Sequence, residues 1–221
     1  MKMYLPLLLL SVLASPSTDQ QAEKRAFALL DRLCAYSNFQ ASFAYHSQAA
    51  LQEQPEAAFE GTVTVQGNQY RLATADQEII NDGKTVWTYL AAHNEVQIDD
   101  HDPDQVATMP WTLLTGYRQD YAFCSLRTQQ DDKQVCDVVA LRAKDEEATL
   151  LQVILTIERG TNHIKRLEVL DNNETWHVCS ITAFVTDLAL DASFFSFDTE
   201  HYPGIEIDDF SHNSKDDETH T

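Results

Sequence analysis

The chain has 221 residues and a formal net charge of −20, from 35 acidic and 15 basic residues. This length predicts a single domain that can bury an apolar core without metal ions or disulfide bonds. The excess of negative charge argues against nucleic acid and anionic lipid surfaces as partners, because both would be repelled. It fits either an ordinary solvated surface or docking onto a basic partner.

Residues 1–17 have the pattern of an export signal. Lys2 supplies a positive start, Met3 to Ala14 form a Leu-rich apolar stretch, and small residues follow at Ser15 and Ser17. We expect cleavage between Ala14 and Thr18. The alternative is a retained membrane anchor, but the apolar stretch is short for a segment that spans a bilayer.

The mature chain is predicted to begin with a helix. Ala26, Leu30 and Leu33 recur at helical spacing, after cap residues near Asp19. One face of this helix should therefore pack against apolar side chains. Asn38 is expected to end it.

Most of the remaining chain alternates between apolar and polar residues and predicts short antiparallel strands. The first strand contains Phe39, Ala41, Phe43 and Tyr45, and a last long strand runs from Trp176 to Phe184. Turns are predicted at Gly67-Asn68, Asp82-Gly83, Asn94, Asp131-Asp132, Gly160 and Asp171-Asn172. Strands in series with tight turns indicate an antiparallel meander, and no strand–helix–strand rhythm supports a parallel fold.

A second helical stretch is predicted from Met109 to Gly116, with Trp111 and Leu114 on one face. A curved sheet closes its concave side with side chains or with helices, so this piece could cover it as a lid. The predicted domain spans residues 18–210. Residues 211–221 form an acidic tail that lacks apolar residues and should be disordered.

The sequence lacks the motifs of common enzymes. It contains no Gly-x-Ser-x-Gly elbow and no phosphate-binding glycine loop, and it has only six glycines. His101 lies among Asp99, Asp100 and Asp102, but adjacent strand residues point in alternating directions and rarely converge on one ion. We therefore expect no catalytic residues, no metal ion and no cofactor.

Cys34, Cys124, Cys136 and Cys179 fit no zinc-binding spacing. Export would permit disulfide bonds, and Cys124 and Cys136 could face each other across a hairpin that turns near Gln130. The alternative of free buried cysteines stays open.

Several segments together resemble the LolA-type outer-membrane lipoprotein carrier proteins, over roughly residues 20 to 208. The most telling segment runs from Asn81 through Asp82-Gly83-Lys84-Thr85 to Tyr89. The others are Phe39 to Phe43, Glu60-Gly61, Asn94 to Ile98, Phe194 to Asp198 and Tyr202 to Ile205.

The resemblance implies a fold and a task. The expected fold is mainly β (α+β), an incomplete antiparallel β-barrel whose strongly curved sheet has an N-terminal helix and a short lid helix over its concave apolar face. The implied task is that of a periplasmic chaperone without enzymatic activity. It would take acylated lipoproteins from an inner-membrane ABC transporter, pass them to a possible outer-membrane acceptor, and work as a monomer.

The candidate cavity residues are apolar side chains on alternating strand positions. They are Phe39, Phe43, Val63, Leu72, Trp87, Tyr89, Val153 and Leu155, with Trp111 and Leu114 assigned to the lid. The spacing alone favours an ordinary packed core over a ligand cavity. Known family members carry an Arg before Pro at the end of the strand after the Glu-Gly pair, and that Arg helps to hold the lid closed. The equivalent stretch here is Gln66-Gly67-Asn68, and nearby Arg71 is no obvious substitute, so that role is not transferred.

Two rival functions and one variant of the carrier function follow from the same residues. Related sheets occur in envelope-stress sensors, which usually carry a second domain. A small esterase on a barrel scaffold would need a nucleophile motif. A carrier of another lipid or amphiphile is also consistent with the pattern.

Overall fold

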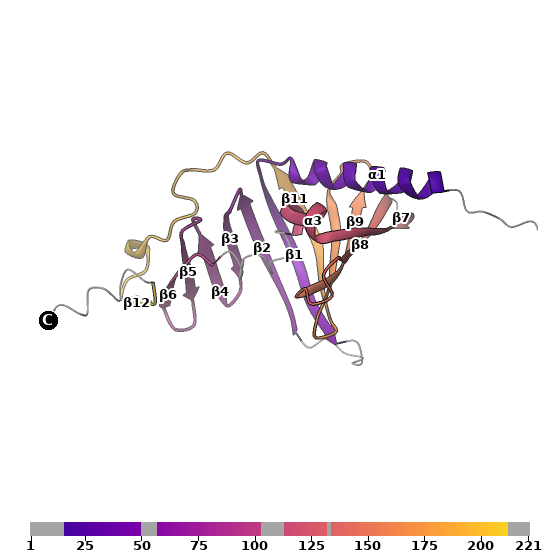
Figure 1. Cartoon of the computed structure of the whole chain (residues 1–221). Helices are drawn as coiled ribbons and strands as arrows, with labels where there is room; N and C mark the ends of the chain where they lie inside the picture. The colour runs from indigo at the N-terminus through magenta and orange to yellow at the C-terminus, as the bar shows by residue number, and fades with distance from the viewer. Residues whose placement is uncertain (1–15, 50–56, 103–112, 132–133, 212–221) are drawn as a thin grey trace, which may run out of the picture.

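The computed structural model describes residues 16–49, 57–102, 113–131 and 134–211 (Figure 1). One large curved sheet dominates it, accompanied by two α-helices and a short 3-10 helix in the described residues. The helices are α1 (Pro16–Cys34), α3 (Leu113–Asp120) and η1 (Thr199–His201). The predicted mainly β fold with an N-terminal helix is confirmed.

The sheet has 12 strands in the order β12-β6-β5-β4-β3-β2-β1-β11-β10-β9-β8-β7. They are β1 (Asn38–Ala49), β2 (Ala57–Gln66), β3 (Gln69–Thr74), β4 (Gln77–Asn81), β5 (Thr85–Leu90), β6 (Glu95–Asp100), β7 (Tyr121–Asp131), β8 (Gln134–Ala143), β9 (Leu150–Glu158), β10 (Ile164–Asp171), β11 (Thr175–Thr186) and β12 (Glu206–Asp209).

The sheet consists of two meanders joined by a long-range pair. Strands β1 to β6 and strands β7 to β11 each follow one another, and antiparallel pairing of β1 with β11 connects the two series. Strands β7 and β12 end the sheet and do not pair with each other, so the barrel is incomplete. The antiparallel series expected from the turns are present, but the β1–β11 pair that joins them was not predicted, because turns indicate only pairs that are adjacent in the sequence.

Most predicted turns connect the strands as expected. Asp82 and Gly83 link β4 to β5, and Gly83 adopts a φ of 93°, which favours glycine. Strand β12 was not predicted. It has four residues, three of them acidic, and it pairs parallel with β6.

Helix α1 lies across the β7–β11 part of the sheet (Figure 1). Ala26, Leu30 and Leu33 are buried in one cluster with side chains from β8, β9 and β10. The helix ends at Cys34 and not at Asn38 as predicted. Asn38 begins β1 instead, and its side chain exchanges hydrogen bonds of 2.7 and 3.0 Å with the backbone of Leu188.

Helix α3 begins at Leu113 and reaches Asp120, four residues past the predicted end. Residues 109–112 lie outside the described residues. The Tyr117 hydroxyl donates to Asp31 of α1 at 2.5 Å, and Arg118 forms an ion pair with the same carboxylate at 2.6 Å. These bonds attach α3 to α1.

None of the four cysteines takes part in a disulfide bond, so the hairpin disulfide does not form. The turn between β7 and β8 lies beyond Asp131, and this register places Cys136 opposite Gln129. Cys124 lies further along β7, at a register shift between Phe123 and Ser125. Cys136 and Cys179 are buried, whereas Cys34 and Cys124 are exposed.

Candidate ligand-binding cavity

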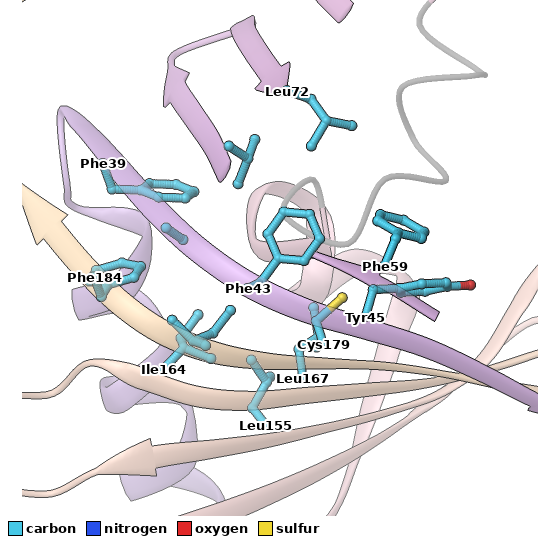
Figure 2. A pocket seen from close by; sticks show the side chains of 13 residues that line it. Phe39, Phe43, Tyr45, Phe59, Leu72, Leu155, Ile164, Leu167, Cys179 and Phe184 are labelled. Atoms are coloured by element: carbon cyan, nitrogen blue, oxygen red, sulfur yellow. The ribbon is translucent and has the colours of Figure 1, made fainter. Parts of the chain in front are cut away.

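An apolar cavity of about 170 Å³ opens on the concave face, defined here as the face that carries Ala41, Phe184 and Leu155. Thirteen side chains line it (Figure 2). They are Phe39, Ala41, Phe43, Tyr45, Phe59, Val63, Leu72, Leu155, Ile164, Leu167, Cys179, Ile181 and Phe184.

The register of the sheet brings these side chains together. Ala41 of β1 lies opposite Val63 of β2, which lies opposite Leu72 of β3. On the other side Ala41 lies opposite Phe184 of β11. Directly opposed residues share one face of a sheet. Side chains from six strands therefore converge on the cavity, namely β1, β2, β3, β9, β10 and β11.

Gly61 of β2 makes room for the Phe43 ring. A side chain at this position would begin 2.9 Å from the Phe43 Cζ atom and 2.9 Å from the Ala73 carbonyl oxygen. The lack of a Cβ atom therefore allows the ring to lie flat over β2. The Glu60-Gly61 pair noted in the sequence thus has a packing role at the cavity wall.

Aromatic pairs mark the two ends of the cavity. The Phe39 and Phe184 rings stack with their centroids 5.4 Å apart, and the Tyr45 and Phe59 rings lie 4.6 Å apart. Figure 2 shows the first pair and the second pair on opposite sides of Phe43. Phe59 is 42% exposed, so one end of the cavity presents a large aromatic side chain to water.

The lining contains two polar side-chain groups, the Tyr45 hydroxyl and the Cys179 thiol. The Tyr45 hydroxyl lies 2.7 Å from His177 Nδ1, and His177 Nε2 lies 3.0 Å from the Asp171 carboxylate. Burial raises the pKa of the Cys179 thiol to about 11, so it is neutral at physiological pH. The cavity wall therefore carries no charge.

Five of the eight predicted cavity residues line this cavity: Phe39, Phe43, Val63, Leu72 and Leu155. Val153 is buried in the α1 cluster, beside a smaller hollow near Leu30 and Tyr117. These are placements in the structure, and the contact of each residue with a ligand stays a prediction.

Trp87 and Tyr89 lie on the opposite, convex face, which carries Thr64, Arg71 and Ile80. Trp87 lies opposite Ile80 of β4, and Ile80 lies opposite Arg71 of β3. Tyr89 packs on Phe197 and Tyr202, with ring centroids 5.9 and 4.5 Å apart. The two residues therefore do not join the cavity.

The sequence could not show this difference between faces. Strand β4 has adjacent apolar residues in Ile79 and Ile80, and β5 has Val86 and Trp87. Either set of alternate residues in such a strand could face the cavity, because both sets are apolar. A shift of the strand by one residue would move each side chain to the other face of the sheet. Both faces of β5 are half-buried here, because the segment from Ser193 to Tyr202 covers part of the convex side.

The cavity also contains residues that the sequence analysis did not select. Tyr45 continues the alternation of Phe39, Ala41 and Phe43, so the same pattern would have found it. Ile181 and Phe184 reach the cavity through the pairing of β11 with β1, which joins residues about 140 positions apart. No local signal indicates that pairing.

The lid residues are only partly described. Trp111 lies outside the described residues. Leu114 belongs to α3, but its side chain also lies outside the described part. Arg71 does not act on this side: it pairs with Glu78 at 2.7 Å and donates to the Phe194 carbonyl at 3.2 Å, both on the convex face.

Within the described residues, no group of three His, Cys, Asp or Glu side chains could hold a metal ion. His101 Nδ1 is hydrogen-bonded to Asn81 Nδ2 at 2.8 Å. Across the same described residues, none of the helices has the length and apolar character needed to cross a bilayer.

Among solved structures, an uncharacterized conserved protein from Thermus thermophilus shares this fold, with a TM-score of 0.53 and 11% identity over 86% of this chain and 99% of that one. A LolA superfamily protein from Nitrosomonas europaea has a TM-score of 0.40 and 14% identity, over 78% and 97% of the two chains. The Pseudomonas aeruginosa MucA/MucB complex has a TM-score of 0.47 and 16% identity, over 80% and 62%.

The half-open barrel with an apolar cavity on its concave face and an N-terminal helix packed on the β7–β11 part of the sheet defines a fold class. Its sequence family is shown by a family profile described as outer membrane lipoprotein carrier protein LolA, which matches residues 17–168. This chain belongs to that family. Comparison with curated proteins gives no match.

Proposed function

We propose that the protein binds the acyl chains of lipoproteins in the concave cavity and carries them between membranes. The observation that supports this most directly is an uncharged, apolar cavity at the mouth of an unclosed barrel. Family membership supports it independently. No catalytic role is proposed for the lining residues.

The cavity suits partial and reversible burial of a chain. Each methylene group removed from water contributes about 0.8 kcal/mol. A cavity of roughly 150 Å³ holds a molecule the size of benzene, so 170 Å³ accommodates only part of an acyl chain. The remainder would lie along the open side, where Phe59 is exposed, or would move the Phe39 and Phe43 rings apart.

The cellular setting belongs to the same proposal. Residues 1–17 would direct export to the periplasm, residues 18–210 would form the carrier domain, and residues 211–221 would stay an acidic tail. Cargo would come from an inner-membrane ABC transporter of the lipoprotein-release type and pass to an outer-membrane acceptor. The net charge of −20 favours docking on a basic surface of either partner.

The decisive experiment is purification from the native envelope, followed by mass spectrometry of bound material. We expect co-purified acylated lipoproteins. In parallel, Ala41→Leu would fill the cavity and lower the affinity for acylated peptides. Ala44→Leu on the opposite face of β1 is the matched control and should leave the affinity unchanged.

The Cys179 thiol offers a second readout. Bound cargo should slow its alkylation by N-ethylmaleimide, whereas exposed Cys34 and Cys124 should react at unchanged rates. An empty protein whose Ala41→Leu variant binds acylated peptides as well as the wild type would rule out the proposed function.

A further inference from the structure

Strand β12 forms one end of the sheet, at the opposite end from β7 (Figure 1). In the described part of the chain it has a neighbouring strand on one side alone, and that neighbour is β6. A strand with an unpaired edge can accept a further strand through its backbone groups. The chemistry of β12 therefore decides which further strand can pair there.

The backbone hydrogen bonds of β12 show which of its groups face the free edge. The Glu206 N–H donates to the Asn94 carbonyl oxygen at 3.0 Å. The Phe210 N–H donates to the Ile98 carbonyl oxygen at 2.8 Å. Successive residues of a strand direct their N–H and C=O groups to opposite sides. The N–H and C=O groups of Ile207 therefore point away from β6, toward the free edge.

Two large apolar side chains are exposed at this edge. Ile207 is 50% exposed and Phe210 is 53% exposed, the highest values among the large apolar side chains of the described residues. Charged residues and proline usually protect a free edge against unwanted pairing, and exposed apolar side chains promote pairing. Ile207 and Phe210 therefore favour an edge that a partner covers.

The same end of the sheet is strongly acidic. Residues 85–102 and 199–211, which include β5, β6, η1 and β12, contain eight Asp and Glu residues and neither Lys nor Arg. Residues 121–171, which include β7 to β10 at the other end, contain nine acidic and seven basic residues. A second copy of this chain would bring an equally acidic edge, so repulsion disfavours self-pairing through β12. A basic strand would be attracted instead.

The alternation of residues along β12 defines the side-chain pattern of a matching strand. Ile207 lies on one face of the sheet, and Glu206 and Asp208 lie on the other. Directly opposed residues of paired strands share a face. A strand that pairs with β12 would therefore place an apolar side chain beside Ile207 and a basic side chain beside each of the two acidic residues. This pattern suits parallel and antiparallel addition equally, because it is symmetric about Ile207.

We propose that the free edge of β12 is a docking site for an extended basic segment of a partner protein, in which basic and apolar residues alternate and which adds to the sheet as a further strand. Strands β4, β5 and β6 separate this edge from the strands that line the cavity. Docking at this edge therefore goes beyond the proposed function and does not depend on it.

The first test uses the full chain and a fluorescent peptide in which lysine and valine alternate. Anisotropy should show binding that weakens as sodium chloride increases. Two N-methylated versions of the peptide keep its charge and side chains, but each lacks the N–H groups of alternate residues. Methylation of the valines should weaken antiparallel addition, and methylation of the lysines should weaken parallel addition.

One of the two methylated peptides should bind at least fivefold more weakly than the parent, the size expected for one hydrogen bond. Equal binding of all three peptides would leave only charge attraction and overturn strand addition. A wild-type chain that does not bind the parent peptide overturns the docking site.

Hydrogen exchange detects pairing at the edge directly. The Ile207 N–H faces the free edge, so the parent peptide should slow its exchange at least fivefold. The Glu206 and Phe210 amides already donate to β6 and should change little. Unchanged exchange at Ile207 in the presence of saturating peptide overturns the docking site.

Ile207→Pro removes the N–H group that faces the free edge and the apolar side chain, and it keeps both printed hydrogen bonds to β6. It should lower the peptide affinity at least fivefold. Slow exchange at Phe210 in this variant checks that β12 is still paired with β6. Undiminished peptide binding by this variant contradicts the proposal.

A second pair of variants tests the charge. Glu206→Gln combined with Asp208→Asn should lower the peptide affinity about fivefold through two lost charge pairs. Glu146→Gln combined with Glu147→Gln is the matched control, because both residues are exposed between β8 and β9 and the change in net charge is the same. The control should change the affinity less than twofold, and an equal loss in both double variants overturns the local charge match.

Two further outcomes assign the edge and separate it from the cavity. A wild-type dimer in size-exclusion chromatography that Ile207→Pro converts to a monomer would assign the edge to a second copy and overturn the basic partner. Ile207→Pro should bind acylated peptides as tightly as the wild type, because three strands separate β12 from the cavity strands. Peptide docking and acyl binding can therefore fail independently.

Discussion

At the scale of single residues, the most tightly held charge in the described part of the core is Asp137 of β8. It is 3% exposed and accepts hydrogen bonds from Arg159 Nε and the Thr128 hydroxyl, each at 3.1 Å. The hydrogen bond from Arg159 holds its pKa below the ordinary value of 3.8, against the opposing effect of burial. A carboxylate in this setting stabilises the fold only while Arg159 is present.

Replacing Arg159 with Met should lower the free energy of unfolding by about 2 kcal/mol at neutral pH, because Asp137 loses its charged partner. The guanidinium is 46% exposed, which keeps the loss below that of a fully buried pair. A lowered pKa in the folded state means that the pair stabilises the protein above about pH 3.8 and loses this contribution as pH falls through the folded pKa.

Urea unfolding at neutral pH and near pH 3 measures both parts of this prediction. The deficit of the variant should shrink as the pH falls from about 3.8 toward the lowered pKa of folded Asp137, because the unfolded chain takes up the proton first. Arg166→Met is the matched control, since its pair with Glu168 is more exposed and should cost well under 1 kcal/mol. A deficit that stays constant with pH contradicts the assignment to Asp137.

At the scale of elements, α3 depends on α1 for its position. Tyr117 and Arg118 both bond to Asp31, and the Arg118 guanidinium lies 4.7 Å from the Phe27 ring centroid. Burial and the hydrogen bond to Asp31 together raise the pKa of Tyr117 to about 12, with burial as the larger cause. The Lys144 ammonium also donates to the Arg118 and Gln119 carbonyl groups at 2.9 and 2.8 Å, so Asp31 attaches α3 to α1 while Lys144 holds its C-terminal end.

Asp31→Asn should loosen α3 without unfolding α1, because it removes the ion pair with Arg118 and weakens the bond from Tyr117. Hydrogen exchange is expected to speed up for the amides of Tyr117 to Asp120, with little change at Leu30. The pKa of Tyr117 should fall below 12, as seen by ultraviolet titration, but stay above 10 because burial persists. Unchanged exchange in α3 would contradict the attachment.

The elements themselves were largely predictable from the sequence. The strand over Phe39 to Tyr45 was predicted from its alternating apolar residues, and the turn at Asp82-Gly83 was predicted from its residue types. Both signals come from residues that are adjacent in the sequence. The face of each strand was less predictable, as Trp87 and Tyr89 show. The short acidic strand β12 has no strand pattern in its sequence. It becomes a strand because it pairs with β6.

At the scale of the whole molecule, the cavity results from one long-range choice. Pairing of β1 with β11 places Phe184 and Ile181 against Ala41 and Phe43, and this brings the two meanders together around one concave face. A curved apolar sheet could be expected from the sequence by family resemblance. Which side chains fill it, and which leave space, depends on this pairing and could not be read from local patterns.

The charge of the whole chain predicts its response to salt. A net charge of −20 destabilises the folded state by self-repulsion, and salt screens that repulsion with a Debye length of about 10 Å at 0.1 M. The melting temperature should therefore rise as sodium chloride increases from low concentration to about 0.3 M. Differential scanning fluorimetry measures it, with uncharged sucrose of equal osmolality as a control, and a flat or falling curve contradicts the prediction.

The close approach of Phe43 to Gly61 has an evolutionary consequence. Any larger residue at position 61 would collide with that ring and with the Ala73 backbone. A smaller residue at 43 would remove only one of the two collisions, because the Ala73 carbonyl oxygen would still lie 2.9 Å from a new Cβ atom at position 61. Position 61 should therefore stay glycine in descendants of this protein, and changes in the shape of the hollow should arise at position 43 instead.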